Sequence, residues 1–321
     1  MTLPLALAAQ LLLAQSDAGY VRERTEDAAH CLRWPVAAGS TAQVTFVQSS
    51  AGDYKLGNGI FDAVSRSEAS WAAQASSCSS LRLFEGGHSP SRITGYDPGR
   101  SNENLILIRT VDCMRAVPAG DPCITAQTCG NVYDCWSYGA ALLALTLLTF
   151  DETGALLDTD VEINGAISYL SLVDAPPCTA GNVNPSCVGN DLQNTVTHEL
   201  GHALGLGHSP DPSSTMFAIA PIGERSKRVL DPASKQFVCD VYPPALASRD
   251  CSLPDGGADP GSGGPGGPGG GPGGPSNGPA SPGIARTSSS GCTAADGGTA
   301  PGLLLAGLGV IALARRRTRS R

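Results

Sequence analysis

The sequence predicts an α/β fold, α+β in some schemes, in which helices back a twisted, mixed and mostly parallel sheet of five strands. Five segments of strand length are rich in apolar and β-branched residues, and other segments show helical spacing or a helix-start signal. One helix interrupts the strands early in the chain, and further helices follow the last strand. This order is typical of a mixed sheet covered by helices.

The first strand is predicted at 42–49, where AQVTFVQS alternates and is rich in β-forming residues. Residues 61–77 place apolar side chains on one broad face, which predicts a helix. The segments SLRLFEG (80–86) and NLILIRTV (104–111) predict two more strands. Residues 118–136 contain three cysteines and two glycines, and we interpret them as a disulfide-pinned loop.

The last two strands are predicted at 141–151 and 160–164, on either side of the turn DETG. A helix then begins near Asp191, a good N-cap residue, and glycines from Gly205 onward end it. Residues 234–242 predict a closing helix.

The composition divides the 321-residue chain into one folded domain and several special segments. Much of the 40 Gly and 24 Pro falls between Pro254 and Gly283 without a three-residue period, which indicates a solvated tether rather than collagen. Without this stretch and the two ends, roughly 220 residues remain, enough for one buried core. The predicted units are a signal peptide (1–16), the domain (17–251), a linker (252–290) and a C-terminal sorting signal or anchor (291–321).

The folded part is acidic. The formal net charge of the chain is −8, from 21 basic and 29 acidic residues. Five of the basic residues are arginines at the C-terminal end, and without them the balance is 16 − 29 = −13. This charge argues against a nucleic acid as partner.

Ten of the eleven cysteines lie between Cys31 and Cys251, and Cys292 stands alone. An even number without zinc-ribbon spacing favours up to five disulfides in an oxidising compartment over scattered free thiols.

Both ends of the chain predict export. The N-terminus has an apolar run from Leu3 to Ala14, followed by a small-x-small site, which is typical of a secretory signal peptide. Near the C-terminus, Cys292 precedes an apolar run over 303–314 and the arginine cluster. This tail resembles the myxobacterial C-terminal sorting signals, and the resemblance implies processing near Cys292 and retention at the cell surface or outer envelope. The alternative is a plain membrane anchor, with the domain facing outward in either case.

The segment THELGHALGLGHS carries the candidate chemistry. His198 and His202 are four residues apart, so both rings project from one face of a helix and can bind one metal ion. Glu199 lies beside them and can act as general base on a water at the metal without binding the ion. Gly205 lets the chain turn back, so that His208 returns as third ligand. Three protein ligands leave a fourth position open, which is the catalytic arrangement of zinc.

The motif HELGHALGLGH resembles the signature of the metzincin zinc peptidases, and the following SPDPSSTMF resembles the matrixin branch. The resemblance covers about residues 30–243. It implies a metzincin, zincin-like fold with one catalytic zinc on His198, His202 and His208. It also implies that Met216 is the Met-turn residue, an apolar floor under the metal and not a ligand.

Several features depart from the family pattern. Phe217 and Ala218 stand where related enzymes carry a tyrosine, so no phenol assists there and zinc must polarise the carbonyl largely alone. The cysteine-switch motif of the propeptide is absent, and Cys31 is expected in a disulfide rather than on the zinc. Acidic loops around Asp97 and around Asp158 and Asp160 are candidates for Ca²⁺, with solvated turns as the alternative.

From these features we expect a secreted, surface-attached zinc endopeptidase that cleaves proteins or peptides. We expect it to act as a monomer, and the tail to provide membrane or cell-surface attachment. The alternative is a non-catalytic binding module, or adhesin, on the same scaffold.

Overall fold

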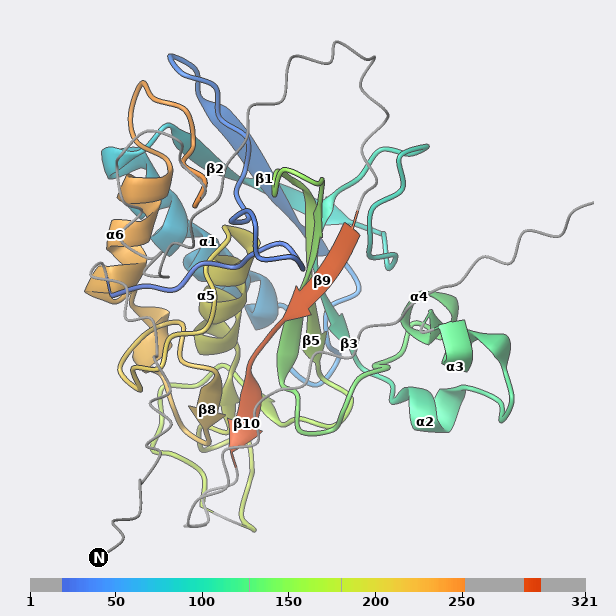
Figure 1. Ribbon diagram of the computed structural model, residues 1–321. Coiled ribbons are helices and arrows are strands. Elements are labelled where there is room, and N and C mark those ends of the chain that lie inside the picture. Colours follow the sequence, from blue (N-terminus) through green and yellow to red (C-terminus); the bar gives the residue numbers. More distant parts are fainter. Residues whose placement is uncertain (1–18, 127, 180, 252–285, 296–321) are drawn as a thin grey trace, which may run out of the picture.

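The computed structural model describes residues 19–126, 128–179, 181–251 and 286–295. Its main sheet has six strands in the order β2-β1-β3-β5-β4-β9, and helices α1, α5 and α6 lie together on one side of it (Figure 1). The strands are β1 (Ala42–Ser49), β2 (Leu81–Ser89), β3 (Asn104–Arg109), β4 (Ala144–Phe150), β5 (Leu156–Asn164) and β9 (Arg286–Ser290). The helices are α1 (Gly59–Cys78), α5 (Leu192–Ala203) and α6 (Pro232–Val241).

The predicted mixed, mostly parallel sheet is confirmed. Strands β2, β1, β3 and β5 pair in parallel, and β4 pairs antiparallel with β5 across the DETG turn. Gly154 in this turn has φ +76°, and a Cβ there would lie 2.7 Å from the carbonyl oxygen of Cys31. The position therefore needs glycine, and the tight turn returns the chain along β5.

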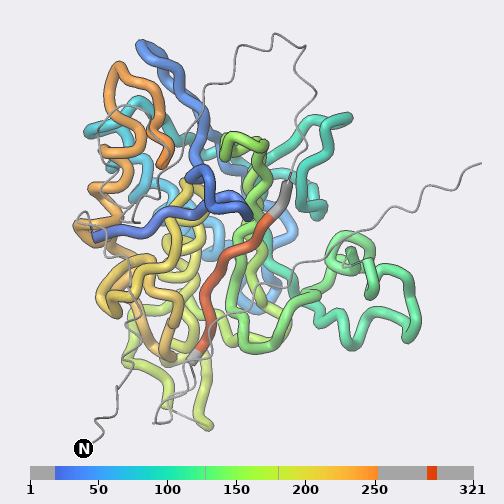
Figure 2. The backbone as a smooth tube through the Cα atoms, in the orientation of Figure 1, coloured from blue at the N-terminus to red at the C-terminus, as the bar shows by residue number. Residues whose placement is uncertain are grey.

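The sixth strand comes from a segment that sequence analysis assigned to the linker. Residues 286–290 pair antiparallel with β4, so the linker prediction of a solvated tether does not describe these residues. Figure 2 shows this red segment running beside the green strand β4. The residues RTSSS show no apolar alternation and therefore no strand signal. Backbone pairing holds this segment to the edge of the sheet. The rest of the tether, the signal peptide and the run 303–314 lie outside the described residues.

The core lies between the sheet and the helices, and α5 runs through it with nearly all of its residues buried. Trp71 of α1 is fully buried and donates its indole N–H to the carbonyl oxygen of Thr197, at 2.9 Å. Asp191 caps α5 as predicted, since its carboxylate accepts the backbone N–H of Asn194 at 2.8 Å. Helix α5 is therefore held at its start and along its length.

Five disulfides join the ten cysteines of the domain, as the even count predicts. They are Cys31–Cys251, Cys78–Cys239, Cys113–Cys135, Cys123–Cys129 and Cys178–Cys187. Among the described cysteines, only Cys292 is free, and it is buried. Cys31 is therefore in a disulfide, as expected.

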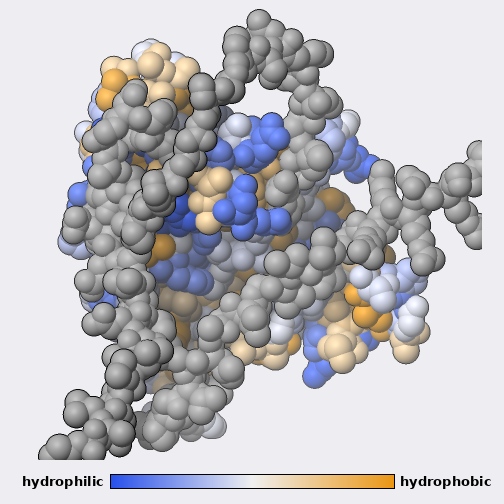
Figure 3. All heavy atoms as spheres, in the orientation of Figure 1, coloured by the Kyte–Doolittle hydropathy of each residue, from blue (hydrophilic) through white to orange (hydrophobic). Residues whose placement is uncertain are grey.

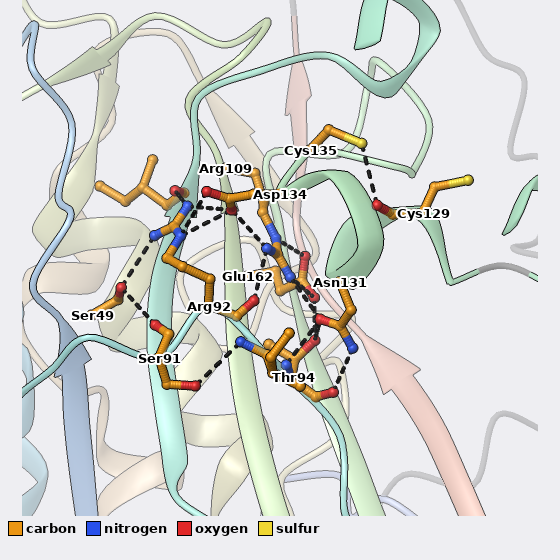
Figure 4. Close-up of polar contacts among 12 residues, drawn as sticks. Ser49, Ser91, Arg92, Thr94, Arg109, Cys129, Asn131, Asp134, Cys135 and Glu162 are labelled. Atoms are coloured by element: carbon orange, nitrogen blue, oxygen red, sulfur yellow. Dashed lines mark hydrogen bonds and ion pairs between the residues drawn. The ribbon is translucent and has the colours of Figure 1, made fainter. Parts of the chain in front are cut away.

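The predicted loop 118–136 is part of a small lobe with three short helices. These are α2 (Cys113–Ala116), α3 (Pro122–Ala126) and α4 (Cys129–Tyr133). Two disulfides close the lobe, and Figure 3 shows hydrophobic surface over it. Buried Arg109 of β3 ties the lobe to the sheet, because it pairs with Asp134 at 2.8 Å and with Glu162 of β5 at 2.9 Å (Figure 4).

No helix in the described part of the chain is long and apolar enough to cross a membrane.

Candidate metal centre

Helix α5 ends where the chain must turn back toward its own side chains. Gly205 has φ +102°, and a Cβ there would lie 2.3 Å from the carbonyl oxygen of Leu32. Only glycine meets both demands. The turn is closed by the N–H of Leu206, which donates to the carbonyl of Gly201 at 3.0 Å. The next residues bring His208 back to the helix.

The structure brings the three predicted histidines together. The Nε2 atom of His202 lies 3.2 Å from Nε2 of His198 and 3.2 Å from Nε2 of His208. Two ligands of a tetrahedral zinc ion, each at about 2.0–2.1 Å from it, lie about 3.3–3.4 Å apart. The spacing therefore fits three nitrogens around one ion.

Backbone carbonyls determine which ring nitrogen carries the proton in two of these histidines. Nδ1 of His198 lies 2.7 Å from the carbonyl oxygen of Thr215, and Nδ1 of His202 lies 2.7 Å from that of Leu206. A carbonyl only accepts, so each Nδ1 carries the proton and each Nε2 presents a lone pair. Two such nitrogens cannot hydrogen bond to one another, and a shared cation accounts for their approach.

Burial keeps the histidines neutral, as ligands must be. Burial, together with the neighbouring His208, lowers the pKa of His198 to about 3. Burial likewise lowers the pKa of His202 and of His208. Neutral imidazoles held in a dry site fit a divalent cation well.

Met216 lies beneath this turn of α5. Its side chain is buried, and its Sδ atom would lie 2.3 Å from a Cβ placed on Gly201. The carbonyl of Met216 accepts the N–H of Ser209 at 2.9 Å. The methionine therefore packs against α5 at Gly201, between His198 and His202, and supports the loop that carries His208.

Comparison with known protein families agrees with this geometry. Residues 131–242 match the model of the matrixin family of peptidases. This part of the chain is therefore similar to a matrixin domain. The match spans β4, β5, α5 and α6, so it includes every histidine of the centre.

Relatives of the matrixin segment are matrix metalloproteinases. The chain is 41% identical over 68 residues to matrix metalloproteinase-16 of Homo sapiens and of Rattus norvegicus, which is 21% of this chain and 11% of each relative. It is 60% identical over 30 residues to the probable matrix metalloproteinase 095L of invertebrate iridescent virus 3, which is 9% of this chain and 8% of that protein. The chain thus spans only about a tenth of the length of these relatives.

Glu199 lies at the matrixin centre with partners on both carboxylate oxygens. The hydroxyl of Thr146 on β4 donates to Oε2 at 2.8 Å, and the backbone N–H of Cys292 donates to Oε1 at 3.2 Å. Burial raises the pKa of Glu199 to about 7, against the lowering effect of these hydrogen bonds. A carboxylate with a pKa near neutrality can both take up and release a proton.

Sequence reasoning missed Thr146, and it did not predict that Cys292 lies beside Glu199. A threonine in a strand carries no signal of its own, and its role arises only when β4 meets α5. Cys292 is predicted as part of a sorting signal, whereas the structure places it against Glu199, with His198 also close by. Burial and the Glu199 charge raise the pKa of this thiol.

The acidic residues suggested for calcium have other partners. Asp158 and Asp160 are buried in β5 rather than in a solvated loop, and Asp160 accepts the N–H groups of Gly95 and Leu105. Asp97 lies in an exposed turn and pairs with Arg100 at 3.1 Å. These contacts satisfy the carboxylates of Asp160 and Asp97, and among the described residues the only groups of three or more metal-ligating side chains include His198.

Proposed function

We propose that this chain is a zinc-dependent endopeptidase with Glu199 as its general base. The observation that carries the proposal is the convergence of three histidine Nε2 atoms, two of them fixed as lone-pair donors, beside a buried carboxylate. The matrixin match supports the same class of reaction.

The residues of the site fit the roles that peptide hydrolysis needs. His198, His202 and His208 would hold zinc, which when bound supplies a Lewis acid that polarises a carbonyl and acidifies a water. Glu199 takes a proton from the attacking water and passes it to the leaving amine. Thr146 orients the carboxylate, and the buried surroundings strengthen these electrostatic interactions.

The sheet edge at β4 provides the place for a substrate. An extended peptide can add to this edge as an antiparallel strand, bound by its backbone. Phe217 and Ala218 follow Met216 without a phenol. Stabilisation of the developing oxyanion would therefore fall to a bound zinc ion rather than to a tyrosine at these positions.

We also propose that the domain works outside the cytoplasm, attached through its C-terminal tail. Five disulfides support an oxidising compartment. Fractionation of cells that produce the full chain tests this, since recovery in the cytoplasm with reduced cysteines would contradict it.

The activity is tested with the full chain and a library of unstructured peptides. We expect internal cleavage of peptides, loss of cleavage with a chelator, and recovery when zinc is added back. Cleavage that persists unchanged in the chelator would overturn the proposal, and so would zinc-loaded chain that cleaves no peptide.

A further inference from the structure

Residues 286–295 cross the matrixin centre as an extended chain held on both sides. Before the centre, β9 pairs antiparallel with β4, and Ser290 lies opposite Thr146. After the centre, β10 (Thr293–Ala295) pairs in parallel with β8 (Ile219–Pro221), which follows Met216 (Figure 1). The segment therefore occupies the edge where an external peptide would bind.

One peptide bond of this segment faces the catalytic groups. The N–H of Cys292 donates to Oε1 of Glu199 at 3.2 Å, and the backbone of Gly291 hydrogen bonds to His208. The carbonyl of Cys292 accepts the N–H of Leu143 at 2.9 Å. The Gly291–Cys292 bond thus lies between the general base and one of the three histidines.

Close packing around Gly291 and Cys292 determines which peptide bond of the segment lies at the centre. A Cβ on Gly291 would lie 2.2 Å from the carbonyl oxygen of Ala144 and 2.7 Å from Cα of Leu145. Any larger residue would therefore push the segment away from β4. Cys292 is 1% exposed, so its side chain is enclosed by the site. The pair Gly-Cys fixes which peptide bond reaches the centre.

The flanking contacts hold the bond in place. The N–H of Thr293 donates to the carbonyl of Ala218 at 2.9 Å, and the N–H of Ala294 donates to that of Ala141 at 3.0 Å. The hydroxyl of Ser290 donates to the carboxylate of Glu23 on the other side. Backbone and side-chain hydrogen bonds on both sides restrict the motion of Gly291–Cys292, and such positioning favours reaction within the chain.

We propose that the chain cleaves its own Gly291–Cys292 bond, so that its first substrate is its own C-terminal segment. This inference rests on the proposed peptidase function. The oxygen of a water bonds to the carbonyl carbon of Gly291, the C–N bond breaks, and the amine of Cys292 receives a proton through Glu199. The products are a carboxylate at Gly291 and a fragment that begins at Cys292.

Two consequences follow from this reaction. The apolar run 303–314 and the arginine cluster lie after Cys292, so cleavage ends the proposed attachment of the domain through its C-terminal tail. Departure of the fragment also frees β4 and β8 for an external peptide.

The test uses the full chain, purified with a chelator and started by addition of zinc. Intact mass and N-terminal sequencing follow the products, while an unrelated peptide cleaved by the wild type reports activity on external substrates. We expect a new N-terminus at Cys292, formed at a rate that does not change on dilution, and none in Glu199→Gln.

Gly291→Ala is the informative variant, with Gly139→Ala as its matched control because a Cβ at Gly139 meets no atom within 4 Å. We expect Gly291→Ala to slow self-cleavage about ten-fold or more, since the bond is displaced from the catalytic groups. We expect this variant to cleave the external peptide still, because the displaced segment no longer covers the edge of β4. Gly139→Ala should process itself like the wild type.

The outcomes separate the two proposals. If the external peptide is cleaved while the chain stays intact, is cut elsewhere, or is cut at a rate that falls on dilution, self-cleavage within the chain is refuted and the peptidase function stands. Formation of the Cys292 fragment by Glu199→Gln, or at the wild-type rate by Gly291→Ala, also refutes it. If neither substrate is cleaved, the peptidase function itself fails.

Discussion

Two backbone carbonyls decide which ring nitrogen of His198 and His202 is free to bind a metal. The carbonyls of Thr215 and Leu206 each take up one Nδ1–H, so the lone pairs converge from Nε2. His208 is held differently, because it reaches the centre on the loop after Gly205. Its contribution can therefore be tested apart from that of the helix.

His208→Ala should release zinc. Removing one of three protein ligands leaves two histidines, and we expect the affinity to fall by about 100-fold or more, beyond what loss of an outer partner costs. Elemental analysis after dialysis measures this. The matched control is His88→Ala, since His88 packs against the ring of Phe61 at a centroid distance of 4.4 Å, away from the centre. If the His208→Ala variant binds as much zinc as the wild type, His208 is not a zinc ligand.

At the scale of elements, helix α1 carries a buried carboxyl group in surroundings that disfavour its charged form. Glu68 is 5% exposed, and neither carboxylate oxygen has a hydrogen-bond partner in the structure. Burial raises the pKa of Glu68 to about 8, and the charge of Glu85 adds to the effect. Because the pKa of Glu68 is higher in the folded chain than in the unfolded chain, the protonated side chain contributes its full stability to the fold at pH values below the unfolded pKa of 4.5. That stability is lost as the pH rises toward 8, because only the unfolded chain ionises.

Glu68→Gln should therefore stabilise the domain at pH 8 but not at pH 5. The shift corresponds to an upper bound of about 5 kcal/mol in the free energy of unfolding, and we expect a gain of about 1–3 kcal/mol. Denaturant unfolding at both pH values measures the difference. Glu152→Gln, at an exposed turn, should change little at either pH. An equal effect of Glu68→Gln at both pH values would contradict the assignment.

The main sheet and the helices were predictable because their patterns are local. Alternation predicts β1 at 42–49, and the N-cap signal predicts the start of α5 at Asp191. The strand β9 was missed because serine-rich residues have no apolar periodicity, and only the free edge of β4 makes them a strand. Likewise, 93 residues separate Cys292 from Glu199, so their contact arises from the tertiary fold alone.

At the scale of the whole molecule, a disulfide and a buried ion pair hold the domain together, and a bound zinc ion would add a third constraint. Disulfide Cys31–Cys251 joins its ends, and the buried pair Arg109–Glu162 joins β3 to β5. Zinc at the centre would join α5 to the loop of His208. Only the last of these constraints is reversible under mild conditions.

Chelation should lower the melting temperature without unfolding the chain at room temperature. A ligand that binds only the folded state adds stability by mass action, about 4 kcal/mol when its concentration is a thousand times the dissociation constant. The disulfides keep the metal-free chain folded. Thermal unfolding with chelator, and again after zinc is restored, measures this. Identical melting temperatures with the chelator and after zinc is restored would show that zinc bound to the histidines does not stabilise the fold.

The central claim is that Glu199 performs the chemistry at a metal it does not bind. In Glu199→Gln, the amide oxygen can still accept a hydrogen bond from Thr146 or from the N–H of Cys292, but the side chain cannot take up the proton of a water. The decisive measurement is peptide cleavage and zinc content on the same preparation of this variant. We predict full zinc content with cleavage reduced by about 10²–10⁴-fold. Cleavage at the wild-type rate, or loss of the zinc, would contradict this account.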